Sequence, residues 1–437
     1  MILIYTHKIT KRVHYIFKLF FDTLLGVPFE LTTDLEKFRA CNGPKISYCK
    51  KYSDCGIYFN ASNLLFESGI EGQEPGFSMY EDCASFFPVY DKKSVLPFDP
   101  FAASFFLVTR YEEYLPYIKD RFGRFDAHES VASKHGFLDK PVVNIWAEKI
   151  KSIINSQYPE VKFKTRVYKF IPTYDIDSAY SFRLKGVVRT VGGIIKALLK
   201  FDFPQIVERG KVLAGLEDDP FDTYDFQLQL QKEYALKPLY FILFAEYGEF
   251  DKNIPVNNRE FQRLIKSLAD YSEVGIHPSF ASNFSIKTLK NEIESLAKIL
   301  NREITKSRQH FLKLNFPTTY RNLINLDITD DYTMGYASET GFRAGICDPY
   351  LFYDLDLETE TKLRIHPFQV MDGTLKDYQQ LSPEEAIIKI KKMVDEVKAV
   401  NGTFISLWHN ETLSNIDRWE GWQDVYPELL KYASNME

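Results

Sequence analysis

The feature that most constrains this chain is an alternation of short apolar runs and amphipathic helices from about residue 166 onward. The clearest unit comes last, where SPEE at 382–385 has the pattern of a capping box with proline at the first helical position. The helix is then marked by apolar residues at helical spacing, namely Ile387, Ile390, Val394 and Val397. It ends at Asn401-Gly402, and the apolar run 403–408 follows at once. Such alternation predicts a parallel sheet with helices packed on it.

The chain has 437 residues, a length that allows two or three domains at about 150 residues each. Residues 1–165 lack the regular alternation and begin with a predicted strand at 2–5, followed by an amphipathic helix that ends near Gly26. We therefore predict a smaller N-terminal α/β accessory domain over 1–165 and a main domain over 166–437. Residues 185–235 interrupt the alternation and are predicted to form a helical insertion.

Composition excludes several classes of protein. The hydrophobic fraction of 45% excludes disorder, and the net charge of −6 with interspersed signs argues against nucleic-acid binding. The five cysteines are scattered and form no C-x-x-C pair, which argues against a zinc ribbon or a disulfide scaffold and favours a reduced, cytoplasmic protein. The apolar N-terminal segment contains Lys18 and Asp22, so neither a signal peptide nor a transmembrane helix is expected.

Polar residues that can bind metal or move protons follow the predicted strands. Asp175 and Asp177 end the run that begins at Val167, His277 follows the short strand at 274–276, and His409 follows the run 403–408. In parallel α/β folds such strand ends meet at one edge of the sheet. Each signal is weak alone, because a D-x-D pair can cap a surface turn and a single histidine is more often structural.

One aspartate and two histidines form the ligand set of a catalytic zinc or a similar divalent metal with an open position. His310, in a short strand-like segment, joins His277 and His409 as a candidate. The other histidines are interpreted as structural or surface residues: His7, His14, His128, His135 and His366. A further aspartate and histidine would remain as general base and acid, so the set suits metal-assisted hydrolysis.

In order and spacing, several stretches resemble the polysaccharide deacetylase superfamily (carbohydrate esterase family 4, with NodB-like homology). They are TYDIDS at 173–178, GIHPSFAS at 275–282, RQHFLKL at 308–314, DYTMGYASETGFRAG at 331–345 and LWHN at 407–410. DPFAASFFLVTRYEEY at 99–114 and GFLDKPVVNIW at 136–146 also look like a bacterial branch with an extra N-terminal domain. The resemblance implies an α/β fold in which a distorted (β/α) barrel of about seven strands follows the accessory domain.

The resemblance also implies roles for individual residues. Asp175 would be the catalytic base and Asp177 a metal ligand, although Ile176 separates two acids that are normally adjacent. His277 would be the second ligand. The family's usual third ligand is missing, because position 281 is alanine, and we infer that His310 replaces it. The remaining catalytic assignments by resemblance are His409 as general acid, Arg308 from the third motif, and Arg343 as the residue that orients the base or the substrate.

The implied activity is metal-dependent removal of N-acetyl or O-acetyl groups from a carbohydrate, in bacterial surface polysaccharide biosynthesis. Zinc is the first expectation for the metal, with cobalt, nickel or manganese as alternatives. Rings suit stacking on sugar faces. The candidate substrate-binding residues are Trp408, Asn410, Trp419 and Trp422, and the alternative is that the tryptophans pack the C-terminal segment.

Two other functions stay open at this point. One is a different amide hydrolase of the same fold, such as a deformylase. The other is a non-catalytic protein that binds glycan or scaffolds a polysaccharide assembly, since the second motif is altered. The sequence does not determine the sugar, its linkage or the oligomeric state.

Overall fold

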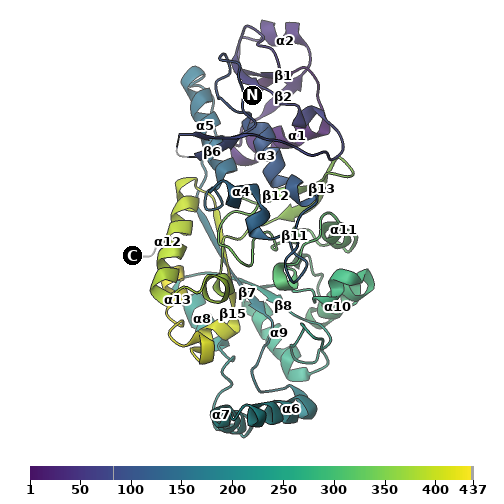
Figure 1. The fold of residues 1–437 in the computed structure, drawn as a ribbon, viewed down its shortest axis with the longest axis vertical. Coiled ribbons are helices and arrows are strands. Elements are labelled where there is room, and N and C mark those ends of the chain that lie inside the picture. Colours follow the sequence, from purple (N-terminus) through teal and green to yellow (C-terminus); the bar gives the residue numbers. More distant parts are fainter. Residues whose placement is uncertain (82, 435–437) are drawn as a thin grey trace.

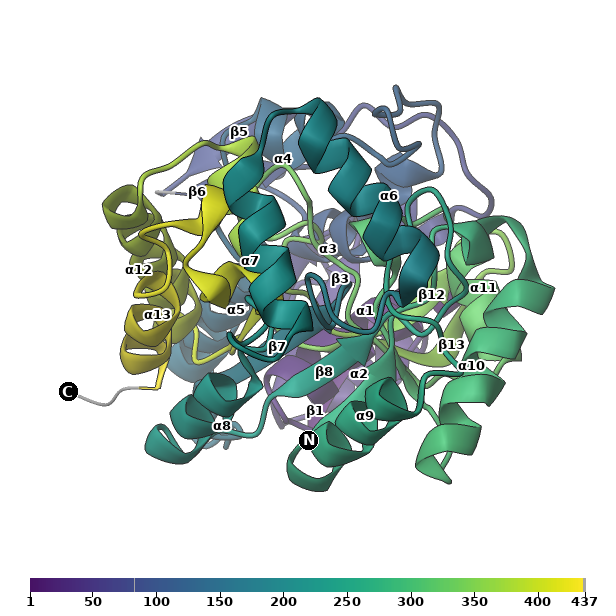
Figure 2. The same cartoon turned by 90° about the horizontal axis from the view of Figure 1, so that it is seen from below.

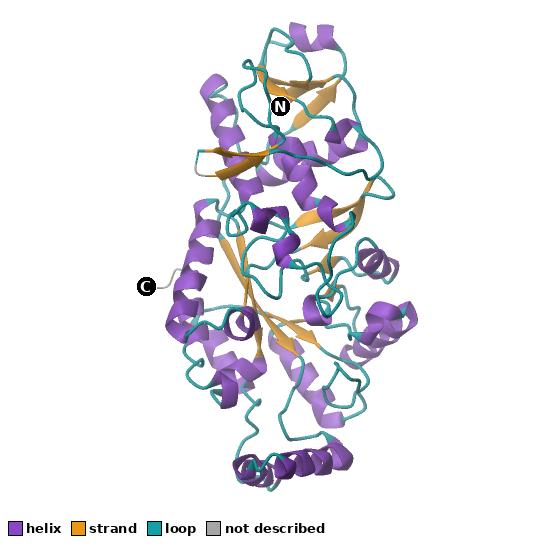
Figure 3. Ribbon diagram, viewed as in Figure 1, coloured by secondary structure: helices purple, strands orange, loops and turns teal. Residues whose placement is uncertain are grey.

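The computed structural model describes residues 1–81 and 83–434 and shows an elongated body built around two sheets (Figure 1). A small sheet lies at one end of the long axis, the large sheet lies in the middle, and a pair of helices stands at the other end. Helices flank both sheets (Figure 3), so the predicted mixed α/β class is confirmed.

The N-terminal half is organised by the small sheet, whose strands are all parallel and lie in the order β2-β1-β3-β4. Its strands are β1 (Ile2–Thr6), β2 (Phe29–Thr32), β3 (Lys45–Cys49) and β4 (Ile57–Asn60), and a separate antiparallel pair is formed by β5 (Phe77–Tyr80) and β6 (Cys83–Phe86). The helices are α1 (Lys11–Phe17), α2 (Leu35–Ala40), α3 (Pro100–Val108), α4 (Val131–Lys134) and α5 (Val142–Gln157). Thr10 caps α1, which continues as a π-helical segment to Leu24, close to the predicted end at Gly26.

The large sheet has nine strands in the order β12-β13-β11-β10-β9-β8-β7-β15-β14. Its strands are β7 (Lys169–Ile176), β8 (Leu239–Ile242), β9 (Glu273–Ile276), β10 (Lys306–Ser307), β11 (Asp330–Asp331), β12 (Tyr350–Asp354), β13 (Thr359–Ile365), β14 (Val370–Met371) and β15 (Thr403–His409). All neighbours are parallel except β12 and β13. In the described part of the chain β12 and β14 are the two edges of an open ladder, so closure into the expected barrel is not observed.

Local sequence explains how the last unit forms. Ser382 Oγ accepts from the backbone N–H of Glu385 at 3.2 Å, and the Glu385 carboxylate accepts from the backbone N–H of Ser382 at 2.8 Å. This is the predicted capping box. Helix α12 (Pro383–Ala399) follows, and β15 pairs along its length with β7. The other helices of this part are α9 (Arg259–Tyr271), α10 (Ile286–Leu300), α11 (Thr318–Asn325) and α13 (Val425–Ala433).

The segment predicted to be a helical insertion contains α6 (Gly186–Leu199), α7 (Phe203–Leu213) and α8 (Tyr224–Glu233). Helices α6 and α7 form a hairpin that stands away from the rest of the molecule (Figures 1 and 2). Helix α8 lies closer to the large sheet, and the hydroxyl of its Tyr224 donates to the carbonyl of Ala179 at 2.9 Å. None of the described helices is long and apolar enough to cross a bilayer.

The two halves share one apolar core that runs through both sheets. Ion pairs also join them: the buried pair of Arg343 Nη2 with Glu113 Oε2 at 2.6 Å, and the partly buried pair of Arg12 Nε with Glu358 Oε2 at 3.0 Å. Many of the aromatic residues lie in the core, as predicted. The ring of Phe101, for example, contacts those of Phe17, Phe20, Tyr48 and Phe59. All five cysteines are free. The division at residue 165 stays a prediction.

Candidate metal centre

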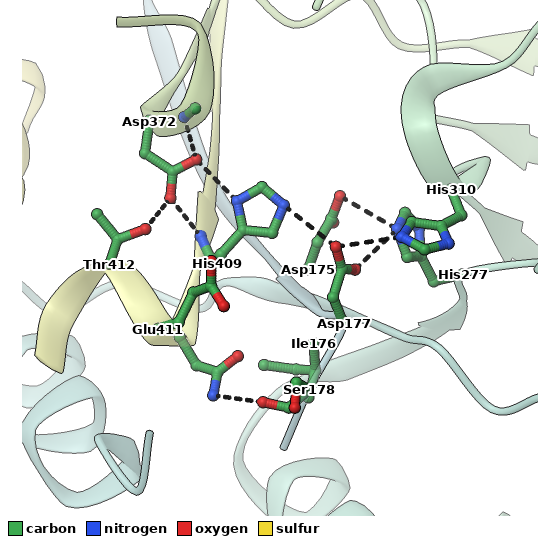
Figure 4. A network of polar contacts seen from close by, with 12 residues as sticks. Asp175, Ile176, Asp177, Ser178, His277, His310, Asp372, His409, Glu411 and Thr412 are labelled. Carbon is green, nitrogen blue, oxygen red and sulfur yellow. Dashed lines mark hydrogen bonds and ion pairs between the residues drawn. The ribbon is translucent and has the colours of Figure 1, made fainter. Parts of the chain in front are cut away.

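Four parallel strands of the large sheet bring polar side chains to one place (Figure 4). Asp175 lies near the end of β7, Asp177 follows that strand, His277 follows β9, and His409 ends β15. His310 begins a short 3-10 turn shortly after β10. Because carboxyl ends of parallel strands share an edge of the sheet, residues far apart in the sequence become neighbours here.

The predicted ligands Asp177, His277 and His310 form a compact cluster. The Nε2 atom of His277 is 3.1 Å from Asp177 Oδ1, and the Nε2 atom of His310 is 3.3 Å from Asp177 Oδ2. One donor atom of each residue lies within 4.8 Å of the others, a spacing at which a single ion can be held. The substitution of His310 for the absent histidine at 281 is therefore compatible with the geometry.

The chemistry of the donors fits a divalent transition metal. Asp177 Oδ1 is buried and accepts no hydrogen bond, although an imidazole nitrogen lies beside it. A buried carboxylate oxygen without a donor is costly, and a cation would satisfy it. One carboxylate with two imidazoles suits zinc, cobalt, nickel or manganese and leaves coordination positions for water or substrate. The donors do not distinguish among these metals.

Both histidines of the cluster are oriented by a bond on the opposite side of the ring. His277 Nδ1 lies 2.5 Å from the backbone oxygen of Arg308, and His310 Nδ1 lies 2.8 Å from Asp251 Oδ1. These bonds place the Nδ1 hydrogen and leave Nε2 of each ring free to act as a ligand toward Asp177. Asp251 is itself fixed by the backbone N–H of Phe280 at 2.8 Å.

Asp175, the predicted base, lies beside the cluster and is almost fully buried. Arg308 Nη1 donates to Asp175 Oδ1 at 2.8 Å and to Thr173 Oγ1 at 2.7 Å, while its Nε donates to the carbonyl of Tyr332. The second oxygen, Asp175 Oδ2, lies 3.8 Å from His277 Nε2. One oxygen is thus held by Arg308, and the other faces the ligand cluster.

His409, the predicted acid, approaches from the other neighbouring strand. Its Nε2 lies 3.7 Å from Asp177 Oδ2, and its Nδ1 lies 2.7 Å from Asp372 Oδ1 (Figure 4). Asp372 is fully buried and also accepts from the His409 backbone N–H at 2.7 Å and from the Thr412 hydroxyl. The imidazole is therefore fixed in one orientation, with Nε2 directed toward the cluster.

The electrostatics of the cluster reflect the buried carboxylates around the rings. Burial opposes a charge on His310, but Asp177 and Asp251 raise its pKa to about 9. Burial likewise opposes a charge on His409, but Asp372, Asp177 and Asp175 raise its pKa to about 10. Burial would raise the pKa of Asp177, yet His310 and His277 hold it well below the usual range. Positive charge is thus favoured here, and a bound cation would supply it at Asp177 in place of protons.

The cluster opens into a cavity of about 360 Å³ lined by Asp175, Asp177, His277, His310 and His409. Arg124, from the N-terminal half, forms part of the wall. Its Nη1 donates to the carbonyl of Phe311 at 2.8 Å and its Nη2 to the Tyr378 hydroxyl at 3.2 Å. The N-terminal half therefore helps to shape the cavity.

The predicted substrate-binding residues fall into two groups. Trp419 lines the cavity, with the guanidinium of Arg418 placed 4.8 Å from its ring centre. Trp408 and Trp422 are fully buried and do not line it; Trp408 packs on Tyr426, and Trp422 packs edge-on against Trp419. For these two the alternative of a packing role agrees with the geometry.

Asn410 and Arg343 are also placed away from the cluster. The Asn410 amide donates to the carbonyls of Ser178 and Phe221 at 3.1 and 3.0 Å, so it ties loops together. Arg343 forms a buried pair with Glu113 and donates to the carbonyl of Gly335. The partner of Asp175 is instead Arg308, so the geometry does not support Arg343 as the residue that orients the base.

A family model described only as a family of unknown function, DUF7033, matches residues 2–159. A search of curated proteins found no match. Among solved structures, a Mycobacterium smegmatis protein described as a polysaccharide deacetylase is 14% identical, with a TM-score of 0.39, over 61% of this chain and 85% of that one. An allantoinase is 9% identical with a TM-score of 0.40, over 62% and 86%. These identities and TM-scores are too low to support a functional assignment, which must rest on the residues of the site.

Sequence reasoning missed Asp372 and Asp251, which orient His409 and His310. Asp372 follows β14 and so satisfies the same strand-end rule that identified Asp175 and His409. Asp251 lies in the loop between β8 and α9, where no pattern pointed to it. Arg124 was missed because its contacts with Phe311 and Tyr378 join residues far apart in the sequence.

Proposed function

We propose that this protein is a metal-dependent hydrolase that removes N-acetyl or O-acetyl groups from a carbohydrate, in bacterial surface polysaccharide biosynthesis. The observation that carries the proposal is the convergence, in one cavity, of a three-residue ligand cluster with a carboxylate and an oriented imidazole beside it. The choice of acetyl group and of carbohydrate rests on the motif resemblance.

Asp177, His277 and His310 would hold the metal. When bound, a divalent cation supplies Lewis acidity and lowers the pKa of water to near neutrality. Asp175 accepts the proton of the attacking water at Oδ2, because Arg308 already occupies Oδ1. Arg308 keeps the carboxylate in place.

His409 acts as the general acid. Asp372 holds Nδ1 and stabilises the imidazolium, so the proton on Nε2 is available to the departing amine or alcohol. Asp372 is the main influence that raises the pKa of His409, and it supports this role, since the ring must carry a proton before it donates one. Cleavage then releases acetate and the free amino or hydroxyl group of the sugar.

The proposal is tested by stripping the protein of metal, reloading it with zinc, cobalt, nickel or manganese, and assaying N-acetylated sugars and nucleotide sugars. We expect acetate release that depends on metal and is lost in Asp175→Asn, which keeps the ligands. His14→Gln, an exposed histidine outside the cluster, should behave as the wild type. Formate release would identify a deformylase instead. Retained glycan binding without bound metal would identify a non-catalytic protein.

A further inference from the structure

The hairpin formed by α6 and α7 exposes apolar side chains on a scale that no packing role explains. On α6, Val188 is 86% exposed and Leu199 is 77% exposed, and Phe201 in the connecting turn is also 77% exposed. The other strongly exposed apolar residues of the hairpin are Val187, Val191, Ile195, Leu198, Phe203, Val207, Leu213 and Leu216. Figure 2 shows the two helices in front of the rest of the molecule. An exposed apolar surface of this kind marks an interaction site.

The exposed residues of α6 form one stripe. At about 100° per residue, Val187, Val188 and Ile195 lie with the other exposed apolar residues of the helix within roughly 120° of arc. Ala197, the buried residue of α6, lies on the opposite face, which is turned toward the protein. On α7 the exposed Phe203 and Val207 are four residues apart and share a face, while Arg209 and Val212 are buried. Each helix thus presents an apolar face outward.

The stretch that contains α6 has charged side chains of one sign. Residues 178–201 contain five basic side chains and no acidic one, although the protein as a whole has a net charge of −6. Lys196 and Lys200 lie on α6 and directly after it and are exposed. At 100° per residue Lys196 lies beside the apolar stripe, and Lys200 follows the last residue of α6, so the segment combines apolar and cationic surface. The acidic residues of the hairpin begin at Asp202, which caps α7. Buried Asp219, after the hairpin, accepts from the backbone N–H groups of Phe182 and Arg183 at 2.8 and 2.9 Å.

The hairpin is fixed to the body through its inner side. Arg189 donates to the carbonyls of Asn253 and Lys252 at 2.8 and 2.6 Å and lies over the ring of Tyr247. Gly193 allows the guanidinium of Arg209 to pass against α6, where a Cβ atom would lie only 2.7 Å from Arg209 Nη1. The outward faces of α6 and α7 are therefore held in a defined orientation.

We propose that the α6–α7 hairpin binds the surface of a lipid bilayer that carries anionic headgroups. Its apolar stripe enters the boundary between headgroups and acyl chains, and the bordering lysines contact the headgroups, as in interfacial amphipathic helices. A second copy of the chain fits less well, because it would bring the same basic side chains against one another. Helices of 14 and 11 residues lie on such a surface and do not span it. The proposal is independent of the proposed enzymatic activity.

The experiment is flotation of the full-length protein with vesicles of phosphatidylcholine alone or of equal parts phosphatidylcholine and phosphatidylglycerol. We expect binding to the anionic vesicles that is about tenfold or more stronger than to the neutral ones and weakens as salt is added. The doubly substituted Val188→Asp/Leu199→Asp should lose about tenfold or more of this binding. The matched control is Ile388→Asp, an equally apolar and exposed position on α12, which should bind as the wild type does.

A second variant, Lys196→Glu/Lys200→Glu, keeps the apolar stripe and tests the charge; it should bind neutral and anionic vesicles alike. Circular dichroism and metal content confirm that each variant is folded. The proposal is overturned if the wild type floats with neither vesicle, or if Ile388→Asp loses as much binding as the hairpin variant. It is also overturned if light scattering shows a dimer that Val188→Asp/Leu199→Asp dissociates while no vesicle binding occurs.

Discussion

Two regions at the carboxyl edge of the large sheet contain histidine–carboxylate contacts, and they differ in what surrounds the contact. His366, which follows β13, places Nε2 at 2.7 Å from Asp330 Oδ1, and its ring stacks on Tyr332 with centres 4.2 Å apart. At the candidate metal centre, the single carboxylate of Asp177 faces three imidazoles at 3.1, 3.3 and 3.7 Å.

The two regions differ in the number of imidazole rings that surround one carboxylate: three at Asp177 and one at Asp330. His366 has one carboxylate partner, and burial lowers its pKa despite that partner, which describes a neutral ring in a packed environment. At the metal centre several carboxylates raise the pKa values of His310 and His409 instead. A buried histidine–aspartate pair therefore does not by itself indicate a metal site, whereas donors that converge from separate strands fit one.

The largest effect is expected from removing a ligand. His277→Ala should abolish stoichiometric zinc binding and lower turnover by about 1000-fold or more, since the metal contributes several kcal/mol. His366→Gln should retain the metal. Elemental analysis after gel filtration checks both variants. Loss of metal in His366→Gln would remove the distinction between the two regions.

The next effect concerns the acid. His409→Gln should lower kcat by about 100-fold or more while zinc remains bound, because the proton donor is lost and the three ligands are not. Asp372→Asn should lower kcat less and alter the pH profile, since the imidazole stays but its orienting charge is gone. Steady-state kinetics across pH with metal content measured in parallel tests this. If His409→Gln releases the metal, His409 is a ligand.

A smaller effect is expected at Asp251, which contacts the proposed ligand His310 on the side of the ring away from the cluster. Asp251→Asn should weaken zinc affinity by about 10- to 100-fold and leave kcat at saturating zinc nearly unchanged. Glu249→Gln is the matched control, as an exposed acid two residues away in the same loop. Competition with a chelator measures the affinity. Equal affinities in the two variants would show that the contact of Asp251 with His310 has no influence on the metal.

The smallest effect is expected for the contact between His366 and Asp330. Burial opposes ionisation of Asp330, yet the hydrogen bond from His366 is the main influence that lowers its pKa from 3.8 to about 2. That contribution to stability is present above the unfolded pKa of 3.8 and is lost as the pH falls to about 2. Asp330→Asn should thus cost about 2 kcal/mol at neutral pH, with a cost that shrinks in acid. Urea unfolding at several pH values measures it; a cost independent of pH would contradict the assignment.

Much of the candidate site could be predicted because its residues end recognisable strands. Asp175, Asp177, His277 and His409 follow apolar runs, and parallel pairing then brings them together. Asp372 could not be found as easily, because β14 has two residues and shows no periodicity. Position 251 lies in a loop, and loop contacts depend on tertiary packing.

The fold could be predicted from the sequence to a similar extent. The class, the unit from Ser382 to His409 and the helical nature of the insertion follow from local patterns. The open order of nine strands could not be predicted, since β10, β11 and β14 are too short to be recognised. The tryptophans show another limit: ring type did not indicate that Trp408 and Trp422 are buried while Trp419 lines the cavity.

The ion pairs that cross between the halves bear on how the chain unfolds. Arg343 and Glu113 are both fully enclosed, and each neutralises the other from a different half of the sequence. Separation near residue 165 would leave the Arg343 guanidinium without its counterion, which costs several kcal/mol where the charge stays buried, whereas Glu113 would keep its ion pair with Arg110 at 2.7 Å. The two halves also share one apolar core, so we expect the chain to unfold as one cooperative unit, in which loss of the N-terminal sheet also disrupts the candidate metal centre.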